Sequence, residues 1–184
     1  MRGARAVPPG ALFLLTLLAV LAAPAEAQRP GASGGGWAPA QAGLRVGWDN
    51  NANATVAGGQ LRIPVLPSGS LELVPSGDVT FLTGLREYQV NLDAVWVLGG
   101  RRGGLYGGGG LAARNTIFGE SPEGDRETRT GANVVVGLTT RGRFGGVPIG
   151  VQIEARWVFL DAAFDPRVFT FGLNVPLWGW GRGS

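Results

Sequence analysis

Hydrophobic and polar residues alternate along the stretch REYQVNLDAVWVL, residues 86–98. The hydrophobic positions are Tyr88, Val90, Leu92, Ala94 and Trp96. The alternate positions 87, 89, 91 and 93 carry Glu, Gln, Asn and Asp. Successive side chains of a β-strand point to opposite faces, so this pattern predicts a strand with one apolar face and one polar face. A soluble barrel would turn the apolar face inward, whereas a transmembrane barrel would turn it outward to lipid.

Similar alternation recurs along the chain and predicts eight strands. The expected strands cover 44–49, 60–66, 71–82, 86–98, 105–119, 131–141, 149–159 and 168–178. In 105–119 a run of four glycines hides the alternation, so the faces of that strand are not assigned. Pro75 lacks an N–H and is expected to mark a bulge or kink, and residues 67–70 are expected to form a tight turn. The clear strands approach the ~9–11 residues that a tilted transmembrane strand needs. We therefore predict an all-β fold, an eight-stranded antiparallel up-and-down transmembrane β-barrel.

The chemistry of the polar faces favours the arrangement with the apolar face outward. These faces carry few charges for a solvated surface, and acids and arginines are nearly balanced, as a narrow interior requires. The expected interior polar network consists of Arg45, Asp49, Arg62, Glu72, Asp78, Glu87, Asp93, Arg141, Glu154 and Arg156. Tryptophans near strand ends are typical of the aromatic girdles at membrane interfaces. The expected interface aromatics are Trp48, Trp96, Trp157 and Trp178.

The N-terminal region has the pattern of an export signal. Arg2 and Arg5 precede an apolar run at 11–23, which is short for a membrane-spanning helix, and Ala25-Glu26-Ala27 provides a small-x-small cleavage site. We expect a signal peptide at 1–27 and a Gly- and Ala-rich linker at 28–42. The barrel is then expected at 43–178 and a C-terminal tail at 179–184.

Composition limits the possible chemistry. Charged residues make up 16% of the 184 positions, against ~25% in a typical soluble domain, and the net charge is +3. The chain has no cysteine or histidine, so it cannot assemble a Ser-His or Cys-His pair, and we expect neither catalysis nor a cofactor or metal. The scattered arginines argue against nucleic acid as a partner. The run 107–112 matches a dinucleotide-binding fingerprint, but the residues after it do not form an amphipathic helix.

Four features follow one another along the chain: the signal peptide, the GGQLRIPV strand, LYGGGGLA and the closing strand VFTFGLNVPLW. In this order they resemble the pattern of eight-stranded outer-membrane β-barrel proteins of Gram-negative bacteria. These form the superfamily of the OmpA transmembrane domain and OmpX-like porin-family proteins. The resemblance implies an outer-membrane location, with outer-membrane lipid, lipopolysaccharide and the assembly machinery as partners. It also implies periplasmic turns at 67–70, 99–104 and 142–147, and external loops near 50–58, 82–85, 119–129 and 160–167. Such proteins usually end on an aromatic residue, whereas this chain continues as GWGRGS.

The expected function is a structural or surface-interaction role, with a lipid-facing apolar belt and a charge-paired interior. Two alternatives remain at this point, a small-solute pore and a secreted lipocalin-like barrel that binds an apolar ligand inside. In the second case an internal pocket would be lined by Tyr88, Leu92, Trp96, Ile153 and Trp157. A further hypothesis places divalent cations at the acids of the longest loop, Glu120, Glu123, Asp125 and Glu127, although a plain solvated loop fits their spacing better.

Overall fold

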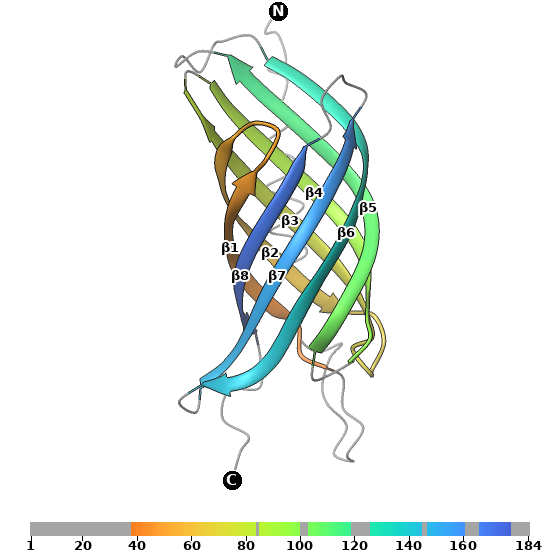
Figure 1. Ribbon diagram of the computed structural model, residues 1–184. Helices are drawn as coiled ribbons and strands as arrows, with labels where there is room; N and C mark the ends of the chain where they lie inside the picture. Colours follow the sequence, from red (N-terminus) through yellow and green to blue (C-terminus); the bar gives the residue numbers. More distant parts are fainter. Residues whose placement is uncertain are drawn as a thin grey trace, which may run out of the picture. The chain divides into compact units, whose positions relative to one another are not determined.

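The structure is a computed structural model that describes residues 38–83, 85–99, 103–118, 126–144, 147–160 and 166–177 (Figure 1). These residues form eight β-strands and parts of their connections. The strands are β1 (Gln41–Asp49), β2 (Ala54–Pro64), β3 (Leu71–Leu82), β4 (Leu85–Val97), β5 (Gly103–Phe118), β6 (Arg126–Phe144), β7 (Val147–Leu160) and β8 (Arg167–Pro176). Within these ranges, no helix is long and apolar enough to cross a membrane. The expected signal peptide, most of the linker and the C-terminal tail lie outside the described residues.

The strands close into a barrel. Each strand pairs antiparallel with the next one in the chain, and β8 pairs with β1. The paired residues can be followed once around the barrel, from Trp96 through Gly107, Val136, Ala155, Phe169, Trp48, Thr55 and Phe81 to Arg86. This path returns to β4 ten residues from its start, a stagger that tilts the strands by roughly 40° from the barrel axis. The predicted eight-stranded antiparallel up-and-down barrel is confirmed.

The two ends of the barrel differ in their connections. We call the end that carries the connections 50–53, 83–84, 119–125 and 161–166 the loop end, which lies at the top of Figure 1. The opposite end, the turn end, carries 65–70, 98–102 and 145–146. The tight turn predicted at 67–70 is present there, with Gly69 at a φ of 67° that favours glycine. At the loop end, the connection after β1 contains Asn53 at a φ of 51°, and Asp49 accepts hydrogen bonds there from the N–H groups of Asn51 and Ala52.

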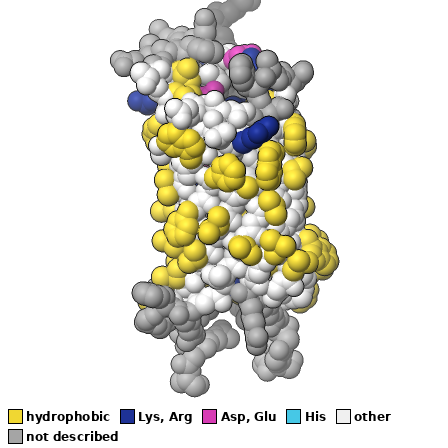
Figure 2. All heavy atoms as spheres, in the orientation of Figure 1, with side chains coloured by type: hydrophobic (Ala, Val, Ile, Leu, Met, Phe, Trp, Pro, Cys, Tyr) yellow, Lys and Arg dark blue, Asp and Glu magenta, His cyan; other side chains and the backbone are white. Residues whose placement is uncertain are grey.

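Hydrophobic side chains project from the outer face of the barrel wall, and Figure 2 shows them on one side of the barrel. Leu44 is 76% exposed and Ile153 is 59% exposed, whereas the polar residues that alternate with them are buried. The faces expected for the strands around 44–49, 71–82, 86–98, 149–159 and 168–178 are therefore those observed. The structure also assigns the strand that the glycine run had hidden: Tyr106 and Ala112 of β5 point inward, and Leu105 points outward.

Three strands start at least three residues before their predicted bounds. β1 starts at Gln41, inside the expected linker, and β2 starts at Ala54 rather than at residue 60, because Gly58 and Gly59 hide its alternation. β6 starts at Arg126, so residues 126–129 are strand and not part of the longest loop. In this first part, β6 pairs with β5 alone among the described strands, because its pairing with β7 begins at Gly131.

Of the bulge or kink expected at Pro75, the register of the strands contradicts the bulge. The register between β2 and β3 is the same on both sides of Pro75, since Gln60 pairs with Ser76 and Ile63 pairs with Leu73. Pairing to β4 runs through Pro75 without a shift, because Pro75 lies opposite Leu92. Only the β2 bridges beside Pro75 are missing, as expected for a residue without an N–H group. The strand therefore accepts the proline without a change of register.

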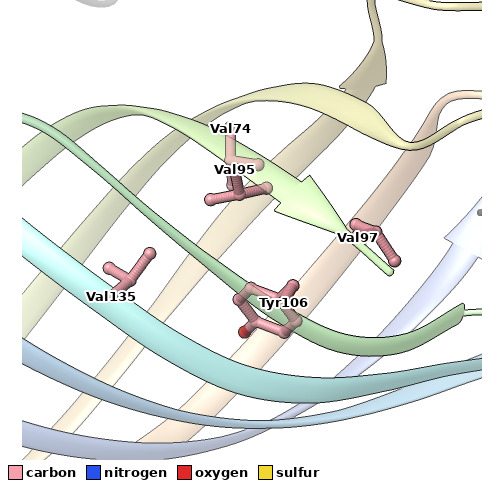
Figure 3. Close-up of a cluster of buried hydrophobic side chains, with 5 residues drawn as sticks. All are labelled: Val74, Val95, Val97, Tyr106 and Val135. Carbon is pink, nitrogen blue, oxygen red and sulfur yellow. The ribbon is translucent and has the colours of Figure 1, made fainter. Parts of the chain in front are cut away.

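A small apolar cluster fills part of the interior near the turn end. Val74 of β3, Val95 and Val97 of β4, Tyr106 of β5 and Val135 of β6 form this cluster, and each is at most 2% exposed (Figure 3). At other levels of the barrel, inward positions of the strands that carry these valines are occupied by polar residues. The interior is therefore packed by valine and tyrosine at this level, by a second apolar cluster of Ala112, Val158 and Leu160, and by polar groups between the two clusters.

Inward-facing glycines make room for the larger interior side chains. A Cβ atom on Gly137 would lie 2.6 Å from the phenol oxygen of Tyr106, and one on Gly58 would lie 2.2 Å from Oδ1 of Asp78. Both separations are far below van der Waals contact. The glycines of the polar faces are therefore required by packing inside a narrow barrel.

Gly137→Ala is expected to lower the free energy of unfolding by about 1–3 kcal/mol, because the added methyl group collides with Tyr106 and with the β7 backbone. Urea unfolding in lipid vesicles, followed by tryptophan fluorescence, measures the change. Gly142→Ala is the matched control on the same strand, since its Cβ would meet nothing within 4 Å. Equal stability of the two variants would contradict this packing role.

Candidate functional site

Arg45 lies at the midpoint of β1 and anchors the interior polar network. It is 3% exposed, and its Nε donates to Oδ1 of Asp78 at 2.7 Å while Nη2 donates to Oδ2 of the same carboxylate. Nη2 also donates to Oγ of Ser76 at 3.0 Å. Nη1 lies 3.4 Å from Oε1 of Gln60 and 3.4 Å from Oε1 of Glu154. The two-pronged contact with Asp78 is a strong form of arginine–carboxylate pairing.

A second group of charges lies closer to the turn end. Arg62 donates from Nε to Oε2 of Glu72 at 2.8 Å, and Arg141 donates to the other oxygen of the same carboxylate. Nη1 of Arg62 lies 3.1 Å from Oε1 of Gln152. The guanidinium carbon of Arg62 stands 4.7 Å from the centre of the Tyr106 ring, a distance at which cations interact favourably with an aromatic face. The carboxylate of Glu72 thus bridges an arginine of β2 and an arginine of β6.

Glu154 of β7 joins the first two groups to a third. Its Oε2 accepts the phenol hydrogen bond of Tyr106 at 2.8 Å, and its Oε1 accepts from Nη2 of Arg156 at 2.9 Å and from Arg45. The same Nη2 of Arg156 lies 2.8 Å from Oδ2 of Asp93 on β4. Glu154 and Arg156 therefore belong to an ion-pair network that reaches across the barrel.

A fourth group lies at the loop end and contains Arg114, which the alternation of the sequence did not predict. Arg114 of β5 contacts Oδ2 of Asp49 at 3.0 Å and Oε2 of Glu87 at 3.2 Å. Oδ1 of Asp49 also accepts the backbone hydrogen bonds of the connection after β1. Arg114 was missed because it lies in the strand that contains the glycine run, and the faces of that strand had not been assigned. Counting two residues at a time from Tyr106 would have placed both residues on one face.

The ten expected interior residues thus all point into the barrel, where they form connected groups together with Arg114 and Tyr106. A set of amides also lies between the charges and was not anticipated as part of the network. Nε2 of Gln60 donates to Oδ1 of Asn174 at 2.7 Å, and Nε2 of Gln152 donates to Oε1 of Gln60 at 3.1 Å. Each charged residue of the interior groups has a partner of opposite sign, as burial in a low-dielectric interior requires.

Side chains of the types that most often ligate metals do not gather in the part of the chain that the structure describes. Its His, Cys, Asp and Glu residues form no group of three or more that could hold a metal ion. Of the acids in the divalent-cation hypothesis, only Glu127 lies among the described residues, and it pairs with Arg129 at 2.8 Å. Glu120, Glu123 and Asp125 lie outside the described residues.

The outer surface carries the apolar belt, which we define as the exposed hydrophobic side chains of the strands. Trp48 is 44% exposed near the loop end of β1, and Trp96 is 50% exposed near the turn end of β4. Trp157 also points outward, near the loop end of β7, and Trp178 lies outside the described residues. On β4, Tyr88 and Trp96 are eight residues apart, which corresponds to roughly 20 Å along the barrel axis at a tilt of about 40°.

The internal pocket of a lipocalin-like barrel is not formed. Of the residues that would line it, Leu92 is 47% exposed on the outer face, Tyr88 and Ile153 are also exposed there, and Trp96 and Trp157 share that face. The interior positions beside Leu92 carry Asn91 and Asp93 instead. An apolar ligand would therefore meet charged and amide groups inside this barrel.

The fold has a counterpart among solved structures, although no family model and no curated protein matches the sequence. The crystal structure of the N-terminal beta-barrel domain of Pseudomonas aeruginosa OprF superimposes with a TM-score of 0.59. The match covers 75% of this chain and 96% of that chain, at 18% sequence identity. The resemblance to eight-stranded outer-membrane barrels is thus confirmed at the level of the fold.

Arg45→Met is expected to lower the free energy of unfolding by about 3–5 kcal/mol, because it leaves the buried carboxylate of Asp78 without its cation. The double variant Arg45→Met/Asp78→Leu removes both charges and should recover a large part of that loss. Glu154 keeps Arg156 and Tyr106 as partners in both variants. Urea unfolding of the two variants in vesicles provides the comparison, and a double variant less stable than the single one would refute the pairing.

Proposed function

We propose that this protein is a bacterial outer-membrane β-barrel with a structural or surface-interaction role and no catalytic activity. The observation that carries the proposal is the apolar belt on a closed barrel whose charges are turned inward. A soluble protein would have to expose these leucines, valines and aromatic residues to water. In a bilayer the same residues meet lipid, and closure leaves no sheet edge within the membrane-facing wall.

Three further features support this proposal. The expected signal peptide would export the chain, and the strands have the length and tilt of transmembrane strands. The OprF domain that this chain resembles in fold is described as a beta-barrel domain.

We infer that the turn end faces the periplasm and the loop end faces outward, since both ends of the barrel sequence lie at the turn end. Assembly in the membrane would then depend on the host's assembly machinery.

A structural role is preferred over a small-solute pore because large side chains occupy the interior. Arg45, Arg62, Tyr106 and Arg156 are buried there and held by several contacts each. An eight-stranded barrel is just wide enough for its own side chains. We therefore expect no steady conductance of the purified protein in planar bilayers.

Expression of the full chain in a Gram-negative host, followed by envelope fractionation and electrophoresis, tests the proposal. We expect a band in the outer-membrane fraction whose mobility changes on boiling, because a closed barrel resists detergent until heated. Deletion of residues 1–27 is the control and should leave the protein outside the membrane. A detergent-free periplasmic band with no change on boiling would contradict the proposal.

A further inference from the structure

Four buried polar side chains form a cluster on one side of the barrel interior. Gln89, Asn91 and Asp93 are successive inward-facing residues of β4, and Asn133 faces inward from β6; each of the four is at most 4% exposed. Nε2 of Gln89 donates to Oδ1 of Asn91 at 2.8 Å, and Nδ2 of Asn133 donates to the same oxygen at 3.4 Å. Asn91 therefore engages the nitrogen of both amides and not their oxygens. We call these four residues the amide–acid cluster.

Three oxygen atoms of the amide–acid cluster have no hydrogen-bond partner within the described part of the chain. They are Oε1 of Gln89, Oδ1 of Asp93 and Oδ1 of Asn133. Arg156 contacts the other oxygen of Asp93, Oδ2, at 2.8 Å. An ionised carboxylate and an amide oxygen can only accept hydrogen bonds. Because buried acceptors without a partner are unfavourable, these three oxygens indicate a bound positive group.

A glycine on the strand between them gives Asp93 and Asn133 a common space. Asp93 pairs with Gly110 of β5, and Gly110 pairs with Asn133 of β6. A Cβ atom on Gly110 would lie 2.7 Å from Oδ1 of Asp93. This oxygen therefore lies over the glycine, where a larger residue would place its side chain. Gly110 thus provides room for a small ligand between the carboxylate and the amide.

Apolar side chains enclose the amide–acid cluster. Toward the turn end, the next inward residues of β4 and β6 are Val95 and Val135, which belong to the apolar cluster in Figure 3. Toward the loop end, the second apolar cluster begins at Val158, which pairs with Asn133. Charges at this level are therefore poorly screened by water, and their attraction or repulsion is strong.

Acids outnumber arginines around the amide–acid cluster. Arg156 contacts Asp93 and Glu154, and Arg45 contacts Glu154 and Asp78, so three carboxylates share two guanidinium groups. The group nearer the turn end has the opposite balance, with two arginines on one carboxylate. A local excess of charge is unfavourable in a low-dielectric interior. One additional positive charge beside Asp93 would balance this part of the network.

We propose that the amide–acid cluster binds one monovalent cation of the size of sodium, through Oδ1 of Asp93, Oδ1 of Asn133 and Oε1 of Gln89. Carbonyl oxygens can replace the hydration shell of such an ion, and one carboxylate balances its single charge. A divalent ion would require more oxygen ligands, with further carboxylates among them. The lack of histidine and cysteine does not bear on this site, because oxygen atoms supply the ligands. The inference goes beyond the proposed outer-membrane role, since it gives the barrel interior a ligand.

Urea unfolding of the full chain in phosphatidylcholine vesicles tests the proposal. Sodium chloride is varied against N-methyl-D-glucamine chloride at constant ionic strength, because this organic cation is too large for the site. Above the dissociation constant, the equilibrium constant for unfolding should fall about tenfold for each tenfold rise in sodium concentration. Asp93→Asn should remove this dependence. Asn133→Ala keeps the charge but removes one ligand, and should raise the sodium concentration that is needed by at least about tenfold.

Glu87→Gln is the matched control, because it removes an acid from the inward face of the same strand and should keep the sodium dependence. The inference is overturned if the stability of the original chain does not change with sodium, and a dependence on pH instead would indicate a proton on Asp93. A sodium dependence that Asp93→Asn retains, or that Glu87→Gln loses, also overturns it.

The change of mobility on boiling, measured on the same samples, shows whether each variant forms the barrel. If Asp93→Asn does not form it, the result for Asn133→Ala alone decides the inference. Failure of the original chain to form and insert the barrel would instead contradict the outer-membrane proposal.

Discussion

Pairing between β1 and β8 closes the sheet, and the other features of the molecule depend on this closure. In a closed sheet, each strand residue faces either the outside or a narrow interior, because side chains alternate and no edge remains along the wall. The alternating sequence therefore has two surfaces to supply. One is covered by leucine, valine and aromatic residues, and the other carries nearly all the charge.

The interior is stabilised by matching each charge with a partner at short range. Removing an ion from water is costly, and the attraction between partners compensates only if the geometry is good. Arg45 meets this condition through its two contacts with Asp78, and Glu72 does so by bridging Arg62 and Arg141. Glycines on the same faces leave room for these long side chains. Closure, pairing and glycine content are thus parts of one packing solution.

The sequence predicted the fold and most of the interior because period-2 alternation is a direct consequence of strand geometry. It could not assign β5, since glycine has no side chain from which a face can be recognised, and Arg114 and Tyr106 were missed for this reason. Gly58 and Gly59 hid the start of β2 in the same way. Pro75 was read as a bulge because the sequence does not show whether a neighbouring strand needs its N–H group. Pairing partners such as Arg45 and Asp78, 33 residues apart, depend on register, which alternation alone does not specify.

The face that meets lipid is the central claim, and site-directed spin labelling measures it most directly. The chain contains no cysteine, so one substitution gives one labelled position. For the chain reconstituted in vesicles, we predict that a label at Leu92→Cys collides readily with dissolved oxygen and poorly with a water-soluble nickel complex, as a lipid-facing site does. A label at Val90→Cys on the same face should behave similarly. A label at Leu92→Cys that is protected from oxygen or readily reached by the nickel complex would contradict the account.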